Sequence, residues 1–183
     1  MTTITAFSTL INQDLACVSA REAITHILNY PRLRQLKRYT QWEFTFGNLT
    51  LPEAESAVTT IFTKTFFLIN PNKENYALRL PANLPKSSGP QIAISVRPKS
   101  PVNWSAMCTK IKSKTSIEVS SIASSTVWVM DLNPGELSEE ALREELTERV
   151  ILAGSVKQGI LVNPVSEQFE WLETRATGTY AVA

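Results

Sequence analysis

The chain has 183 residues, of which 43% are hydrophobic and 19% are charged, a composition typical of an ordinary globular protein with one or two domains. The net charge of +1 excludes a general electrostatic field for nucleic acid or an anionic membrane. One histidine, two cysteines and two aspartates leave almost no material for a His pair, an Asp cluster or a Cys/His zinc site. We therefore expect no enzyme and no bound cofactor or metal.

The N-terminal residues do not resemble a targeting signal. Residues 1–7 lack the basic and apolar regions of a signal peptide, and no apolar run approaches the roughly 18 residues of a membrane span. Cys17 and Cys108 lie outside any CxxC pattern, which favours reduced thiols. We expect a cytoplasmic, soluble protein that contacts no membrane.

The first half of the chain predicts alternating strands and helices. Alternation of apolar and small or polar residues indicates strands, and capping boxes indicate where helices begin. In chain order we expect a strand at 3–11, a helix from a capping box at Ser19–Glu22, an extended stretch at 34–46, a helix from a capping box at Thr50–Glu53, and a strand at 76–80.

A Pro-rich segment divides the chain almost in half. Residues 81–90 hold three prolines, a glycine and two serines and show no apolar periodicity, which is typical of a linker. The second half then repeats the order of the first. We expect a strand at 91–97, a helix at 103–114, an extended stretch at 117–132 broken by a turn at Ala123–Ser125, a helix capped by Ser138, a strand at 169–171, and a tail at 176–183.

Matching residues indicate that the two halves are copies of one unit. Asn70-Pro71 lies over Asn163-Pro164, and in both copies a glutamate, an amide and an aromatic residue follow at equal spacing. Trp42 lies over Trp128, and Ile4 over Ile92, so the second copy is about seven residues longer before its Asn-Pro. The sequence therefore predicts an internal duplication.

Two such copies predict an α+β fold. Each copy is expected to form a ferredoxin-like βαββαβ unit, with an antiparallel sheet and its helices on one face. One copy of roughly 85 residues buries little surface alone, so the two copies should pack as a pseudo-dimer. The expected domains are 1–80 and 91–175, joined by the linker at 81–90 and followed by the tail at 176–183.

The second copy resembles the PurS family, the small subunit of phosphoribosylformylglycinamidine synthase in purine biosynthesis. The first copy is similar with weaker identity, and together the copies cover most of the chain. The matching stretches are Ile94–Arg97, Val127–Leu132, Ser138–Leu142 and Ile160–Phe169, with Phe67–Pro71 and Glu74–Tyr76 in the first copy.

The resemblance implies a non-catalytic subunit. PurS-like chains bridge glutaminase and synthetase subunits as dimers or tetramers, so a tandem version would act as a covalent dimer. Two departures stand out: Pro98–Pro101 and Asn12–Asp14 replace the family's glycine-containing loop, and the second copy carries the extra residues before Asn163. Either departure is consistent with a kept fold and an exchanged partner.

Basic residues form two groups that are candidates for an interaction patch. We place both near the end of the first helix of each copy, where they would receive a phosphate-bearing ligand, an acidic partner or RNA, or would simply keep the protein soluble. The groups are Arg34, Lys37 and Arg38 in the first copy and Lys110, Lys112 and Lys114 in the second.

Other candidates have simpler structural interpretations. Trp42, Phe44 and Phe46 share one face of a strand, where RNA-binding domains place stacking aromatics, but core packing explains them better. His26 has no second histidine or nearby aspartate to orient it, and the glutamates of 136–148 are typical of a solvated helix face. The side chains of Asn70 and Asn163 are expected to bond the turns that follow them.

The sequence thus favours a bridging or assembly subunit with protein partners, by resemblance the glutaminase and synthetase subunits of purine synthesis. A homo-oligomer stays open. The alternative is a binding module for RNA or for another protein complex, and an enzyme ranks third.

Overall fold

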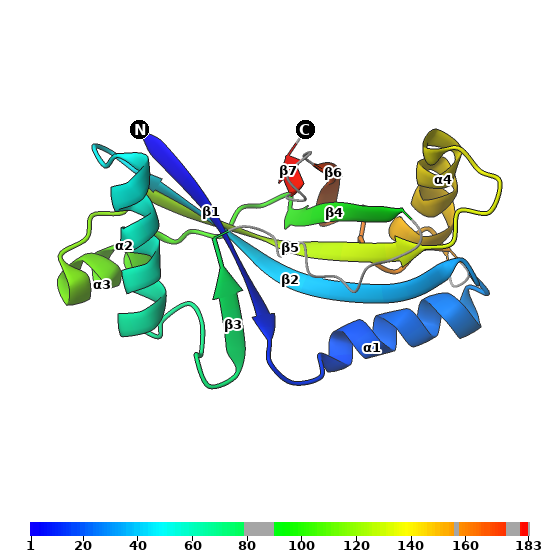
Figure 1. Ribbon diagram of the computed structural model, residues 1–183, viewed down its shortest axis with the longest axis horizontal. Helices are drawn as coiled ribbons and strands as arrows, with labels where there is room; N and C mark the ends of the chain where they lie inside the picture. The colour runs from blue at the N-terminus through cyan, green and yellow to red at the C-terminus, as the bar shows by residue number, and fades with distance from the viewer. Residues whose placement is uncertain (79–89, 156–157, 175–179, 183) are drawn as a thin grey trace. The chain divides into compact units, whose positions relative to one another are not determined.

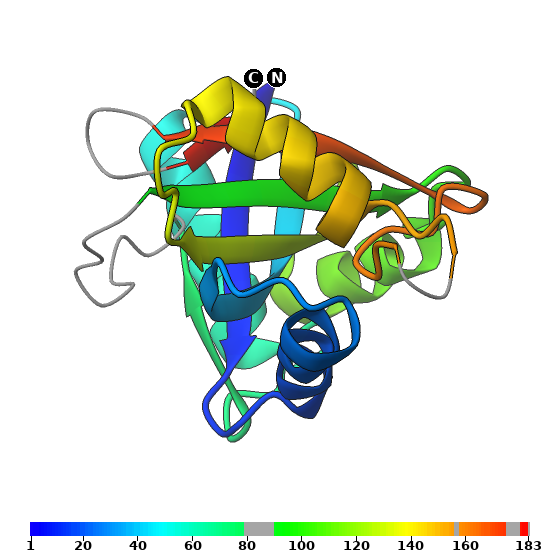
Figure 2. The same cartoon turned by 90° about the vertical axis from the view of Figure 1, so that its right-hand side faces the viewer.

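The computed structural model describes residues 1–78, 90–155, 158–174 and 180–182, and it has an α+β fold (Figure 1 and Figure 2). The α+β class expected from the sequence is therefore confirmed. The strands are β1 (Thr2–Leu10), β2 (Leu33–Phe46), β3 (Glu74–Ala77), β4 (Gln91–Pro98), β5 (Ser121–Leu132), β6 (Glu167–Thr174) and β7 (Tyr180–Val182). The helices are α1 (Leu15–Glu22), α2 (Leu51–Lys64), α3 (Ser105–Thr115) and α4 (Glu139–Leu146), and π-helical segments η1 (Ala23–Ile27) and η2 (Thr147–Ile151) extend α1 and α4.

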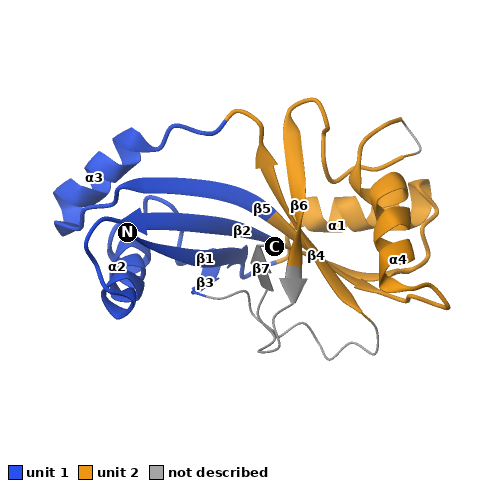
Figure 3. Ribbon diagram, turned by 90° about the horizontal axis from the view of Figure 1, so that it is seen from above, with its two compact units in different colours: residues 1–12, 39–81, 101–126 blue, residues 13–38, 82–100, 127–183 orange. Residues whose placement is uncertain are grey.

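The chain forms two compact units, each built from three separate segments (Figure 3). Unit 1 consists of 1–12, 39–81 and 101–126, and unit 2 of 13–38, 82–100 and 127–183. Each unit therefore takes elements from both predicted copies: α3 belongs to unit 1 and α1 to unit 2, while β2 and β5 run from one unit into the other. Of the expected linker, 81–89 lies outside the described residues. The expected tail contains β7, which pairs with β6.

Unit 1 has the strand order β3-β1-β2-β5. The pairing of β1 with β2 is antiparallel, with Thr2 opposite Phe46 and Ser8 opposite Thr40, and β1 also pairs antiparallel with β3. Helix α2 packs on β1 and on α3. The core between them is apolar and rich in aromatic rings, and its largest fully buried members are Phe44, Phe46, Ile61, Phe62 and Ile111.

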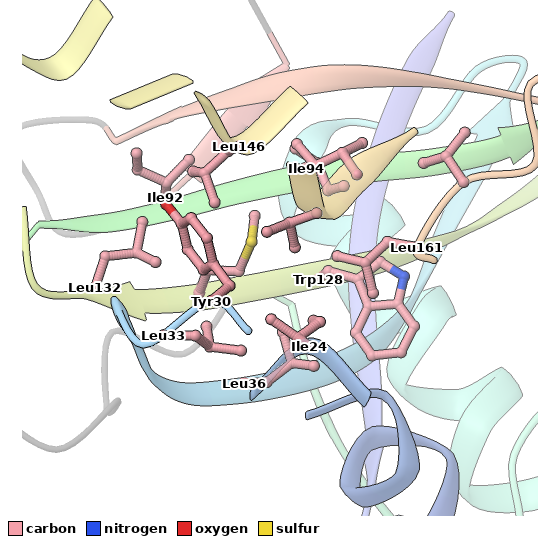
Figure 4. Close-up of a cluster of buried hydrophobic side chains, with 14 of the residues drawn as sticks. Ile24, Tyr30, Leu33, Leu36, Ile92, Ile94, Trp128, Leu132, Leu146 and Leu161 are labelled. Carbon is pink, nitrogen blue, oxygen red and sulfur yellow. The ribbon is translucent and has the colours of Figure 1, made fainter. Parts of the chain in front are cut away.

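Unit 2 has the strand order β2-β5-β4-β6-β7. Strands β4 and β6 are antiparallel, with Ala93 opposite Leu172. Helices α1 and α4 lie on the same face of β4 and β5, as Figure 2 shows, and Figure 4 shows the core that they cover. The second face of these strands is also buried, at Ala93, Ser95, Val127 and Val129, which explains why the end of β5 is an almost continuous apolar run.

Two predicted details of the elements are wrong. The first helix begins at Leu15 rather than at the expected Ser19 box, because the Asp14 carboxylate accepts hydrogen bonds from the backbone N–H groups of Ala16 and Cys17 at 3.0 and 3.2 Å. Strand β5 is continuous through the expected turn at 123–125. In each half one long strand therefore stands where the ferredoxin-like βαββαβ order places two central strands.

Candidate interaction surfaces

Both Asn-Pro segments form turns, and the turn in unit 1 is fixed by a network around Asn70. The Asn70 side-chain oxygen accepts from the Asn72 N–H at 3.0 Å, and its carbonyl oxygen accepts from the N–H groups of Lys73 and Glu74 at 2.8 Å. The Asn70 N–H in turn donates to the Glu74 carboxylate at 2.9 Å. The predicted side-chain hydrogen bond is present, and it leads the chain directly into β3.

The turn in unit 2 has the same hydrogen bonds. The Asn163 side chain accepts from the Val165 N–H at 3.0 Å, its carbonyl accepts from the Ser166 and Glu167 N–H groups at 3.2 and 2.7 Å, and its N–H donates to the Glu167 carboxylate at 2.8 Å. Pro71 and Pro164 follow the two asparagines, and neither proline has an N–H to donate. The matched residues thus form matched local structures.

The backbone also turns into the left-handed region four residues before each asparagine. Phe66 has a φ of 55° and Gly159 a φ of 56°. A Cβ on Gly159 would lie 1.8 Å from the Leu152 carbonyl oxygen, so only glycine fits there. The Phe66 side chain instead projects outward and is 59% exposed. Phe66 opens the apolar run Phe66–Ile69, and nothing in that run signals its exposure.

Among the basic residues of unit 2 that the sequence singled out, Arg38 is engaged within the unit. The Arg38 guanidinium binds the Asp14 carboxylate through Nε at 2.8 Å and Nη2 at 3.1 Å, and it lies 5.9 Å above the Trp128 ring. Arg34 is exposed and Lys37 is half-buried. Arg38 therefore fastens the start of α1 to β2, which is a structural role.

The basic residues of unit 1 lie on a helix. Lys110, Lys112 and Lys114 are all exposed on α3, and Lys112 binds Glu118 at 2.8 Å, an ion pair that lowers the pKa of the Glu118 carboxyl. The expectation that the two basic groups occupy corresponding places is wrong, because Arg34 and Arg38 belong to strand β2. The two groups also belong to different compact units and are described separately.

The aromatic side chains of β2 are buried. Trp42, Phe44 and Phe46 belong to the core of unit 1, and the Trp42 indole N–H donates to the Ser8 hydroxyl at 3.3 Å. Trp42 also meets Trp104 edge to face, with ring centroids 5.6 Å apart. Their burial removes them as stacking platforms for RNA bases, as the core interpretation expected.

The histidine and the two cysteines lie on helical segments. His26 is exposed and lies 3.2 Å from Glu22 on the adjacent turn. The Cys17 thiol donates to the Leu36 carbonyl at 3.1 Å, and burial raises the pKa of both Cys17 and Cys108. Among the described residues, no three His, Cys, Asp or Glu side chains lie where they could hold a metal ion. No helix in the described ranges is long and apolar enough to cross a membrane.

The acidic helix α4 contains contacts that the sequence analysis missed. Glu145 lies 3.4 Å from Arg32 and 3.3 Å from Arg149, and Arg149 also donates to the Asn29 carbonyl and covers the Tyr30 ring. These residues hold the segment after η1 against α4 and η2. The remaining glutamates of the first turns are exposed, as expected for a solvated face, and Glu139 pairs with Arg143 at 2.6 Å.

No protein-family model, no curated protein and no solved structure matches the chain.

Proposed function

We propose that this protein is a non-catalytic bridging or assembly subunit. The observation that carries the proposal is the pair of Asn-Pro turns, which make the same set of hydrogen bonds around Asn70 and around Asn163. Matched turns at matched residues support a duplicated, PurS-like scaffold, because the features that the two halves share are turns. The proposed context is purine biosynthesis, on the basis of the resemblance.

Co-purification from a native lysate tests this role. The full-length chain, tagged and expressed at its natural level, should recover a glutaminase and a synthetase subunit in fixed ratio. A point variant in the Asn163 turn that keeps its fold should be compared alongside, because bridging depends on a correctly built surface. Recovery of a different stable complex without these two enzymes would contradict the purine context.

A second candidate function is an RNA-binding module. Lys110 and Lys114 favour it, because both are exposed four residues apart on α3 and neither makes an ion pair among the described residues. Filter binding of single-stranded RNA by the wild type and by a variant with Lys110, Lys112 and Lys114 changed to Ala tests this candidate. RNA retention that the substitutions leave unchanged and that salt does not weaken would exclude it.

A further inference from the structure

Unit 1 exposes a group of large apolar side chains at one end. Strand β1 and helix α2 both finish at this end, and the segment 65–73 connects α2 to β3 there (Figure 1). Leu10 is 38% exposed, Ile11 51%, Phe66 59% and Phe67 41%. The Ile11 N–H donates to the Lys73 carbonyl at 2.8 Å, which fixes Ile11 beside the turn. We refer to Leu10, Ile11, Phe66 and Phe67, together with Lys64 and Lys73, as the Phe66 surface.

The backbone of Phe66 is held in a strained conformation without compensating burial. Phe66 comes one residue after the C-cap of α2, the place where helices favour glycine in the left-handed region. A bulky residue there costs about 1–3 kcal/mol. Gly159 occupies the matched position in unit 2 and carries no side chain. The strain at Phe66 therefore presents an aromatic ring to solvent.

Two lysines flank the apolar residues. Lys64 and Lys73 are exposed, and neither forms an ion pair within the part of the chain that the structure describes. The carboxylate next to Lys73 in the sequence, Glu74, accepts from the Asn70 N–H and the Ser8 hydroxyl. With two lysines against this one carboxylate, the Phe66 surface keeps a net positive charge, and an occupant of complementary charge is acidic.

We propose that the Phe66 surface docks an acidic amphipathic segment of a partner protein. Phe66 and Phe67 would be the apolar anchors, since aromatic side chains dominate the energetics of protein interfaces. Lys64 and Lys73 would pair with carboxylates at the edge of the segment and set its charge preference. This inference rests on the proposed function, because it names the surface through which a bridging subunit would hold one partner.

Binding of synthetic peptides tests the proposal on the full-length chain. The probe is a fluorescent helical peptide with leucines and phenylalanines on one face and glutamates beside them, and its control is the same peptide with lysines in place of the glutamates. Fluorescence anisotropy should show that the glutamate peptide binds more tightly than the lysine peptide, by about tenfold or more, and that salt weakens it. Equal binding of both peptides, or no binding of the glutamate peptide, overturns the proposal.

Substitutions locate the binding on the protein. Phe66→Gly combined with Phe67→Ser should weaken binding of the glutamate peptide by about 30-fold, the loss expected for a hot spot, without unfolding the chain, because glycine relieves the strain. The matched control is Leu51→Ser, which removes a 57% exposed apolar residue from the other end of α2 and should leave binding unchanged. The double change Lys64→Glu and Lys73→Glu should reverse the preference in favour of the lysine peptide.

Two further measurements exclude other occupants. Sedimentation with phosphatidylserine vesicles tests for a lipid, and sedimentation velocity of the protein alone tests for a second copy. In both measurements the wild type and the variant with Phe66→Gly and Phe67→Ser should behave alike. Association of either kind that these changes abolish would assign the Phe66 surface to a lipid or to a second copy and overturn the proposal. Co-purification of the glutaminase and synthetase subunits is read separately, so a failed docking surface leaves the bridging role intact.

Discussion

Both units place a left-handed residue four positions before the asparagine of their Asn-Pro turn, but under different constraints. In unit 2 the left-handed residue faces the Leu152 carbonyl, so packing dictates Gly159. In unit 1 the left-handed residue faces solvent, so the chain tolerates Phe66 at the cost of local strain. The difference shows that one conformation does not imply one residue type: space around the Cβ decides whether glycine is required or merely favourable.

The largest effect is expected where packing leaves no space. Gly159→Ala should lower the free energy of unfolding by at least about 3 kcal/mol, because the new Cβ combines a clash with a strained φ. Urea unfolding measures the change. The control is Gly154→Ala, whose Cβ would meet only the flexible end of Gln158 at 3.2 Å and should change stability little. Similar losses in both variants would contradict this assignment.

Because the two turns have equivalent hydrogen bonds, disrupting either one should lower the free energy of unfolding equally. Asn70→Ala and Asn163→Ala should each lower the free energy of unfolding by about 1 kcal/mol, because each removes the acceptor of a turn N–H. The double variant should lose about 2 kcal/mol, since the two turns share no hydrogen-bond partner. Aspartate at either position keeps an acceptor oxygen and should restore most of the loss. A loss confined to one turn would break the equivalence.

A buried polar atom predicts a pH effect in unit 2. In unit 1 the Trp42 indole N–H is paired with Ser8, whereas the buried Tyr30 hydroxyl of unit 2 has no hydrogen-bond partner among the described residues. Burial, with a smaller contribution from Glu145, raises the pKa of Tyr30 to about 12 from its ordinary value of 10.0.

Because the folded state holds this proton more tightly, the stability contributed by Tyr30 is complete below pH 10 and is lost as the pH rises toward 12. Tyr30→Phe should therefore reduce the alkaline loss of stability by about 1 kcal/mol at pH 11. Urea unfolding at pH 8 and pH 11 measures both states. An unchanged alkaline loss in the variant would show that Tyr30 does not titrate with folding.

The smallest expected change is a gain. Phe66→Gly should raise the free energy of unfolding by about 0.5–1 kcal/mol, because relief of the left-handed strain outweighs the extra entropy of glycine in the unfolded chain. Thermal and urea unfolding should agree on the sign. A destabilised variant would mean that the exposed ring makes contacts that stabilise unit 1, and would remove the argument that its strain is uncompensated.

Local hydrogen-bonding patterns allowed much of the chain to be predicted. The box at Thr50 and Glu53 marks the start of α2, where the Glu53 carboxylate accepts from the Thr50 N–H at 2.8 Å, and Ser138 caps α4. The box at Ser19 misled because a stronger cap, Asp14, lies five residues before it. Ala123–Ser125 resembled a turn because small residues favour one, yet pairing within the sheet keeps β5 extended.

The candidate site residues also divide into those that the sequence predicts and those that it does not. The asparagine turns were predicted because their partners lie within four residues in the sequence. Engagement of Arg38 by Asp14, burial of Trp42 against Trp104, and exposure of Phe66 were not predictable in detail, because each depends on elements far apart in the chain.

The sequence by itself determined the α+β class, the order of most strands and helices, and the two matched turns, because caps, alternation and Asx hydrogen bonds act over a few residues. Only the tertiary structure decided which unit each element joins: α1 and α3 lie in the units opposite to those of the predicted domains, and β2 and β5 pass through both. The physical reason is that strand pairing and core burial depend on partners far away in the chain, which no local pattern specifies.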